Sequence, residues 1–267
     1  MRFVLQILKE QLSNLYLIFR LASYDMKSKY QMHYLGVFWQ FLNPAVQVLV
    51  YWVVFGLGIR ARNPVDGVPY LIWLLVGLIP WFFISPTIVQ GSNSIYSKVN
   101  LVSKMKFPVS LLPTITIISN SLNFLVLLAI MVLIMFLNGF VPTVFFFQLP
   151  YYLFCTFMFL LAITLLFSTV SVIIRDFQNV LQSFMRMIMF LLPILWDINR
   201  LPDNIQKILM LNPLYYLIEG FRNTFLYETW FYEDILYMSY FWFVTLLILL
   251  IGSILHLKLR SKFIDYL

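Results

Sequence analysis

The chain has 267 residues, of which 62% are hydrophobic and 11% are charged, and its mean hydropathy is +0.88. Soluble domains average about 45–50% apolar and about 25% charged residues, so this composition excludes a chain that folds around a single core in water. We therefore expect an integral membrane protein. We attribute the net charge of +7 to orientation and anionic headgroups at the membrane edge rather than to nucleic acid.

Residues 1–34 predict an amphipathic helix, because apolar residues such as Val4, Ile7 and Leu8 recur at helical spacing. Lys9 and Glu10 interrupt the early apolar residues, which is not typical of a cleavable signal peptide. A helix packed on a soluble neighbour would show the same pattern. The uncharged run that follows at once favours a helix lying on the membrane surface that leads into a spanning helix.

Uncharged runs predict an all-α polytopic membrane domain, residues 35–267, with six spans. The run from Phe107 to Ile174 is too long for one helix, and Asn138-Gly139 divides it. Short apolar patches within 198–233 cannot cross a membrane, so we expect re-entrant or interfacial helices there. The expected spans are about 35–58, 70–92, 111–137, 145–173, 178–197 and 235–257.

The distribution of charge predicts the orientation. Six spans place both termini on one side, together with the loops at 94–108 and 174–186, and that side carries most of the Lys and Arg residues. Basic residues mark the cytoplasmic face, so we expect a multi-pass plasma-membrane protein with both termini in the cytoplasm and 198–233 outside.

Catalysis by this chain alone is poorly supported. His33 and His256 lie at opposite ends of the sequence, and the single cysteine, Cys155, excludes an internal disulfide and a cysteine-rich metal site. No Gly-rich phosphate-binding motif is present. A membrane-embedded transferase using outer carboxylates stays open as an alternative, and the carboxylates are Asp197, Asp203, Glu219, Glu228, Glu233 and Asp234.

Three features suggest transport. The loop at 94–108 is either a connector or a strut that docks on a soluble motor. Aromatic residues make up 19% of the chain, and those that are not interfacial or core residues could stack on sugar rings along a path. Arg186 lies in an expected span, where it either reaches the cytoplasmic surface or meets a lipid pyrophosphate. The candidate path residues are Trp39, Trp73, Trp81, Phe82, Arg186 and Trp196.

An ordered set of short motifs resembles one family. The motifs are YLGVFWQFLNP, VYWVVFGLGIR, GVPYLIWLLVGLIPWFF, SKMKFP, Arg175-Asp176, PILW, NPLYYLIEGFRNTFLYETW and a basic C-terminus. In this order they resemble the membrane subunits of type-2 ABC polysaccharide exporters. Their amino-acid sequences are most similar to those of the permeases of wall teichoic acid. The motifs are short and most of them are apolar, so the specificity lies in their order.

The resemblance implies that two copies pair and that two copies of a separate ATPase, which bind ATP and magnesium, attach beneath them. It implies a lipid-linked anionic polymer, teichoic acid on undecaprenyl pyrophosphate, as substrate. It also implies re-entrant helices near 208–218 and 221–232 and an ATPase-coupling helix at 94–104. The expected coupling residues are Tyr96, Ser97, Lys98, Asn100, Leu101 and Lys104.

Four residues before the first span would lie at headgroup level on the cytoplasmic face: Tyr24, Lys27, Lys29 and Tyr30. They would act as a membrane anchor or as a rim where an anionic lipid head enters. Other hypotheses stay open for the whole chain: export of O-antigen or capsule polysaccharide by the same machine, a transferase, or a passive scaffold or channel.

Overall fold

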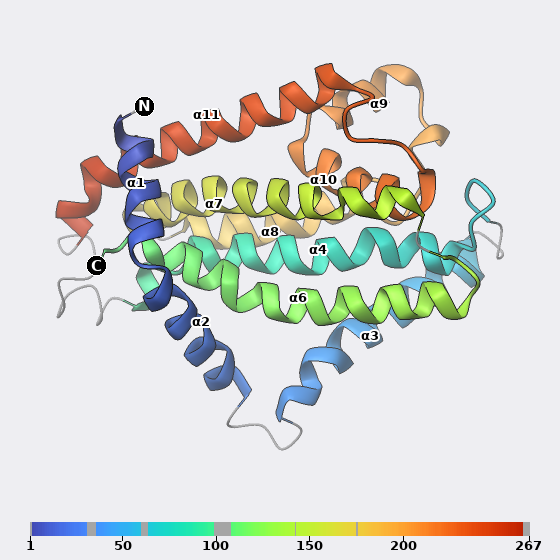
Figure 1. Cartoon of the computed structure of the whole chain (residues 1–267), viewed down its shortest axis with the longest axis horizontal. Coiled ribbons are helices and arrows are strands. Elements are labelled where there is room, and N and C mark those ends of the chain that lie inside the picture. The colour runs from blue at the N-terminus through green and yellow to red at the C-terminus, as the bar shows by residue number, and fades with distance from the viewer. Residues whose placement is uncertain are drawn as a thin grey trace.

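The computed structural model describes residues 2–30, 36–59, 64–98, 108–141, 143–174 and 176–263. Across these residues the chain forms helices and turns, and its one β-type pairing is an isolated bridge between Val65 and Val68. Long helices run side by side along the longest axis of the molecule, and both termini lie at the same end of this bundle (Figure 1). The all-helical prediction is confirmed.

The helix α4 (Tyr70–Ser92) is the centre of the bundle. It contacts α6 (Leu111–Leu137), α7 (Leu149–Ile173) and α8 (Phe177–Leu191), and most of its residues are buried. The apolar residues of α4 are distributed around the whole helix, as expected for a helix that others enclose. A further long helix, α11 (Ile235–Leu259), packs mainly along α7.

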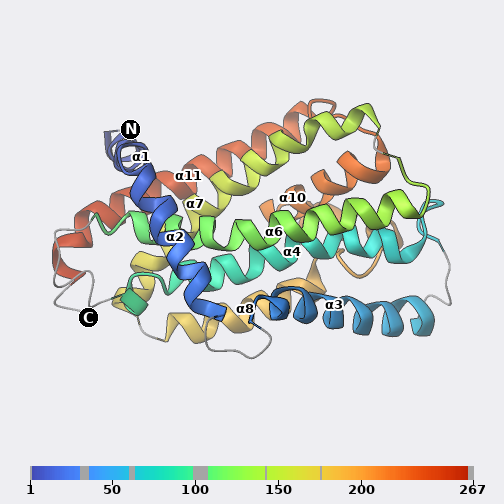
Figure 2. The same ribbon diagram turned by 60° about the horizontal axis from the view of Figure 1, so that its bottom comes forward.

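Among the residues that the structure describes, four segments are long and apolar enough to cross a membrane: Tyr70–Ser92, Leu111–Leu137, Val144–Ile173 and Ile235–Lys262. They coincide with the expected second, third, fourth and sixth spans. The expected first span corresponds to α3 (Trp39–Tyr51), which continues into the π-helix η2 (Trp52–Ile59). Figure 2 shows α3 and α8 on one side of the bundle, beside α4.

The helix expected at 178–197 is shorter in the structure, since α8 ends at Leu191. Pro193 explains the early end: it has no N–H to donate, and it forces the preceding residue out of helical geometry. Leu192 accordingly has φ −73° and ψ 146°. At 1.5 Å per residue, the 15 residues of α8 extend about 22 Å, less than the roughly 30 Å of a hydrocarbon core.

The amphipathic N-terminal segment is two helices, α1 (Arg2–Ser13) and α2 (Leu15–Tyr30), which cross the terminus-bearing end of the bundle (Figure 1). At the bend, the Asn14 side chain donates to the Glu10 carbonyl at 2.8 Å. Glu10 holds α1 in place, because its carboxylate accepts from Ser110 Oγ at 2.5 Å and from Arg260 at 3.0 Å.

The segment 198–233 lies toward the opposite end of the bundle (Figure 1) and contains α9 (Asp203–Met210) and α10 (Pro213–Arg222). The expected helix 208–218 is therefore interrupted. Asn212 separates the two helices, because its side chain caps α10 by accepting from the Leu214 N–H at 3.0 Å. The π-helix η6 (Asn223–Tyr227) follows α10 directly.

Close approach of α10 to α7 requires glycine at position 220. A Cβ added there would lie 2.0 Å from the ring of Tyr152. We expect Gly220→Ala to lower the free energy of unfolding by about 1–3 kcal/mol, because the buried Tyr152 ring must shift. Thermal unfolding of Gly220→Ala, Tyr152→Leu and the double variant forms the test. Strictly additive effects of the two substitutions would contradict a direct clash.

Candidate functional site

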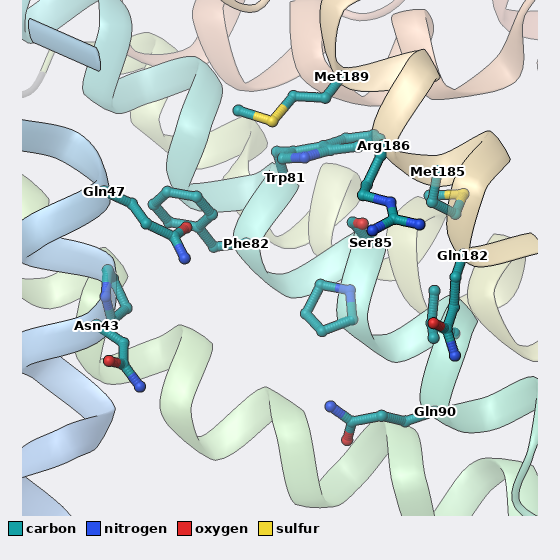
Figure 3. A pocket seen from close by; sticks show the side chains of 13 residues that line it. Asn43, Gln47, Trp81, Phe82, Ser85, Gln90, Gln182, Met185, Arg186 and Met189 are labelled. Atoms are coloured by element: carbon teal, nitrogen blue, oxygen red, sulfur yellow. The ribbon is translucent and has the colours of Figure 1, made fainter. Parts of the chain in front are cut away.

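A polar groove of about 510 Å³ opens between α3, α4 and α8 (Figure 3). Gln47 projects from α3, Ser85 and Gln90 from α4, and Gln182 and Arg186 from α8. Amide, hydroxyl and guanidinium groups are unusual on helices that lie within a membrane. Inside a membrane such groups mark a substrate or ion pathway by default.

A second chamber of about 280 Å³ extends the polar groove toward α6, and the two chambers share Asn43 and Gln90. Here Asn120 and Asn123 of α6 add amides, and Trp39 of α3 forms part of the wall. The Asn120 side chain donates to Thr87 Oγ1 at 3.1 Å and to Gln90 Oε1 at 3.3 Å. These hydrogen bonds fix the α4–α6 side of the groove.

Proline residues explain where the groove forms. Pro44 in α3 and Pro86 in α4 both line it. A proline inside a helix cannot donate to the carbonyl four residues earlier, so each frees one backbone acceptor and bends its helix. Both prolines therefore place a turn that lacks one backbone hydrogen bond at the edge of the groove.

Arg186 is the one charged side chain among the groove residues that the structure describes. It is exposed, and its guanidinium donates to Ser183 Oγ at 3.3 Å. Among the described residues, no carboxylate lies within ion-pair distance of it. The groove therefore presents an uncompensated positive charge, which suits an anionic group.

Four of the predicted path residues meet at this groove, namely Trp39, Trp81, Phe82 and Arg186. Trp73 and Trp196 are not among its lining residues. The Trp196 indole donates to the Phe190 carbonyl at 2.9 Å, at the end of α8. Sequence reasoning missed the amides at 47, 90, 120, 123 and 182, although each is a polar residue within an expected span.

Trp73 belongs to a separate cluster around Arg222 toward the other end of α4. The Arg222 guanidinium lies 3.7 Å from the Trp73 ring, donates to the Ile194 carbonyl at 3.2 Å and pairs with Glu219 at 3.4 Å. The Trp73 indole donates to the Tyr227 hydroxyl at 2.8 Å. The sequence signal was the Glu219-x-x-Arg222 spacing, which places both side chains on one face of a helix.

The Arg222 cluster borders a cavity of about 320 Å³ that also contacts Asp66 and Asp197. Burial raises the pKa of the Glu219 carboxyl, and the neighbouring Arg222 guanidinium opposes that rise. Arg222 is 2% exposed, so its charge is stabilised by Trp73, Glu219 and a backbone carbonyl rather than by water. The cluster joins α10 to α4.

Most of the carboxylates that the sequence predicts on the outer side have structural partners. Asp197 accepts from the Asn199 N–H at 3.0 Å, Asp234 from the Tyr237 N–H at 2.9 Å, and Glu233 from the Trp230 N–H at 2.8 Å. These are capping and turn interactions. No group of three or more His, Cys, Asp or Glu residues in the described parts of the chain is arranged to hold a metal ion.

At the end with the termini, the expected coupling segment begins with the short helix η3 (Tyr96–Lys98). Lys98 forms an ion pair with Asp25 of α2, Ser97 Oγ donates to the Ser94 carbonyl at 3.3 Å, and Tyr96 is exposed. Three of the expected coupling residues fall outside the described residues, namely Asn100, Leu101 and Lys104.

The expected lipid-head residues lie in the second half of α2. Tyr24 and Lys27 are exposed, and the Arg20 guanidinium lies 6.0 Å from the Tyr24 ring. The backbone of Lys29 and Tyr30 forms the last turn of α2. The structure thus brings Tyr24 and Lys27 to the surface of the helix that carries the ion pair to η3.

Comparisons with known proteins cover all the helices around the polar groove. Residues 16–226 match the family described as ABC-2 type transporter. An O-antigen export system permease protein RfbA of Myxococcus xanthus is 29% identical over 211 residues, 78% of this chain and 80% of that protein. Two proteins of the same name from Klebsiella pneumoniae are 25% and 24% identical over 244 residues, 91% of this chain and 92% of each.

Proposed function

The chain belongs to the ABC-2 type transporter family, and from this premise we propose that it is the permease subunit of an ATP-driven exporter of a cell-surface polysaccharide. The observation that carries the proposal is the polar groove. Its amides and Arg186 line a hollow between helices of the membrane domain, and the half-buried ring of Trp39 offers a surface on which a sugar can stack.

The relatives favour one substrate class. They are named O-antigen export permeases, which favours a carbohydrate polymer of the O-antigen type over the teichoic acid that the sequence motifs predict. Both polymers would present an anionic lipid-linked end to Arg186. Transport assays with each polymer on the same lipid would separate the two, because teichoic acid carries phosphate along its length.

The proposed assembly is a homodimer with two ATPase subunits bound at the end that carries the termini, in the cytoplasm. The position of α1, α2 and both termini at that end is consistent with this orientation, as is the density of Lys and Arg there (Figure 1). In this arrangement six segments cross the membrane: α3–η2 is the first, and α8 together with the non-helical residues 192–197 is the fifth.

The Asp25–Lys98 ion pair supplies a sharp test of motor coupling. It joins η3, at the start of the proposed ATPase-docking segment, to α2, which precedes the groove helix α3. We expect Lys98→Glu to lower export several-fold, with ATP hydrolysis by the complex continuing, because the introduced carboxylate would repel Asp25. The double variant Lys98→Glu with Asp25→Lys should restore most of the export.

The measurement is polymer export and ATPase turnover by proteoliposomes containing the chain and its co-purified ATPase. Lys207→Glu, on α9 at the other end of the bundle, is the matched control. Failure of the chain to associate with any ABC ATPase would defeat the transporter proposal itself. Failure of the charge swap to restore export would defeat only this route of coupling.

A further inference from the structure

A third hollow continues from the polar groove and is apolar. This apolar chamber has a volume of about 360 Å³ and lies between α3, α4 and α6. It shares Pro44, Phe82 and Leu127 with the α6 side of the polar groove, so these three residues form the boundary between the two. Beyond that boundary no charged or amide side chain lines the chamber among the residues that the structure describes.

The polarity changes in one direction along the helices. On α4 the polar groove occupies the turns from Trp81 to Gln90, and the apolar chamber occupies those from Leu71 to Phe82. On α6, which runs the opposite way, the amides lie at 120 and 123 and the apolar lining at 127, 130 and 134. The polar end therefore faces the termini, and the apolar end faces α9 and α10.

A hollow with a polar end and an apolar end fits an amphiphilic molecule. A purely polar solute would leave the apolar chamber unfilled, and a hydrocarbon would leave the amides and the Arg186 guanidinium without partners. The apolar chamber adjoins the polar groove at Pro44, Phe82 and Leu127, so a hydrocarbon chain in the chamber would lie next to a head group in the groove. Arg186 and the absence of any carboxylate among the lining residues that the structure describes select a negative head.

We propose that the apolar chamber binds the hydrocarbon chain of a single-chain lipid phosphate whose head group lies in the polar groove near Arg186. The orientation agrees with a lipid taken from the leaflet at the terminus-bearing end, since its head faces that end. This inference rests on the proposed function, for which it names the element that holds the lipid part of the substrate.

Trp52 lines the apolar chamber and gives a direct readout. The full-length chain is placed in phosphatidylcholine nanodiscs, and dodecyl phosphate with bromine atoms on its chain is added. Bromine quenches indole fluorescence on contact, and subtraction of the signal of Trp52→Phe isolates the contribution of Trp52. We expect the fluorescence of Trp52 to be quenched in a saturable way when the probe makes up only a small fraction of the lipid in the nanodisc.

Matched variants assign the two halves of the site. Ala45→Phe would narrow the apolar chamber and should remove most of the saturable quenching, whereas Val46→Phe, at a neighbouring position that is 53% exposed and outside the lining, should not. Arg186→Gln should weaken binding of the phosphate about tenfold or more, because it removes a charge-assisted hydrogen bond. Binding of the corresponding brominated alcohol should be unaffected by that change.

Three results would overturn the proposal. Quenching that rises linearly and equally in all variants would mean contact with bulk lipid only. Saturable binding unchanged in Ala45→Phe and in the milder Ala45→Leu would place the chain elsewhere. Exclusion of the probe together with disulfide formation between copies of Ala45→Cys would mean that a second copy covers the chamber. The experiment uses no ATPase, so its failure is distinct from failure of the exporter proposal.

Discussion

Replacing Arg222 with methionine is expected to destabilise the folded chain by about 3–5 kcal/mol, the largest stability effect of any single substitution proposed for this protein. Methionine keeps much of the side-chain volume and removes the charge. Three contacts are lost together: the ring of Trp73, the carbonyl of Ile194 and the carboxylate of Glu219. The loss therefore exceeds that of an exposed ion pair, which contributes about 0–1 kcal/mol.

The Glu219 carboxyl, which stays in place in Arg222→Met, makes the loss of stability depend on pH. Burial already raises the pKa of Glu219, and Arg222 opposes the rise, so the variant should hold the proton on Glu219 more tightly. A folded chain that binds a proton more tightly than the unfolded chain loses stability as the pH rises through that raised pKa. The loss of unfolding free energy caused by Arg222→Met should therefore be larger at neutral than at acidic pH. It should become smaller when Glu219→Gln is added.

Thermal unfolding of purified protein across this pH range measures both effects, with Arg200→Met as the control. Arg200 is exposed in η5 (Ile198–Arg200), so its replacement should change stability little. Equal stability of Arg222→Met and Arg200→Met would show that the cluster does not hold α10 against α4. Gly77→Ala offers an independent check, because its Cβ would lie 2.9 Å from the Arg222 guanidinium.

The helices whose bounds the sequence could predict are those that residues close together along the chain determine. The observed α4 and α6 have the expected bounds, because uncharged runs and the turn at Asn138-Gly139 determine them. Gly139 indeed has φ +83°, a conformation that glycine adopts without strain. The early end of α8 was readable in principle, because Pro193 lies inside the expected span.

The polar groove and the Arg222 cluster could not be predicted from the sequence, because both depend on distances between residues that are far apart along the chain. Gln47, Gln90 and Gln182 lie on three different helices, and only the packing of α3, α4 and α8 brings them to one groove. Trp73 was predicted as a path residue by its type, yet Arg222, far along the sequence, lies against its face. Aromatic content alone could not distinguish Trp81, at the groove, from Trp73, in the Arg222 cluster.

Replacing Arg186 with glutamine is expected to lower polymer export by about tenfold to a hundredfold. A hydrogen bond to a charged group contributes about 1.5–3 kcal/mol, and each 1.4 kcal/mol corresponds to a factor of about ten. The polar groove has no second described cation to replace it, so the anionic end of the substrate would lose its one charged partner. Arg186→Lys keeps the charge and should retain more export than the glutamine variant, although lysine lacks the planar fork of arginine.

The competing explanation for Arg186, a side chain that only reaches the membrane surface, predicts no loss of export in the glutamine variant. If its side chain only reaches toward the cytoplasmic surface, glutamine removes no contact with the substrate and leaves or eases insertion of the helix, so export should stay normal. Export by proteoliposomes, normalised to the amount of inserted protein and compared with Arg200→Gln, separates the two. Normal export with unchanged or raised insertion would make Arg186 a boundary residue and leave the groove to act through its amides alone.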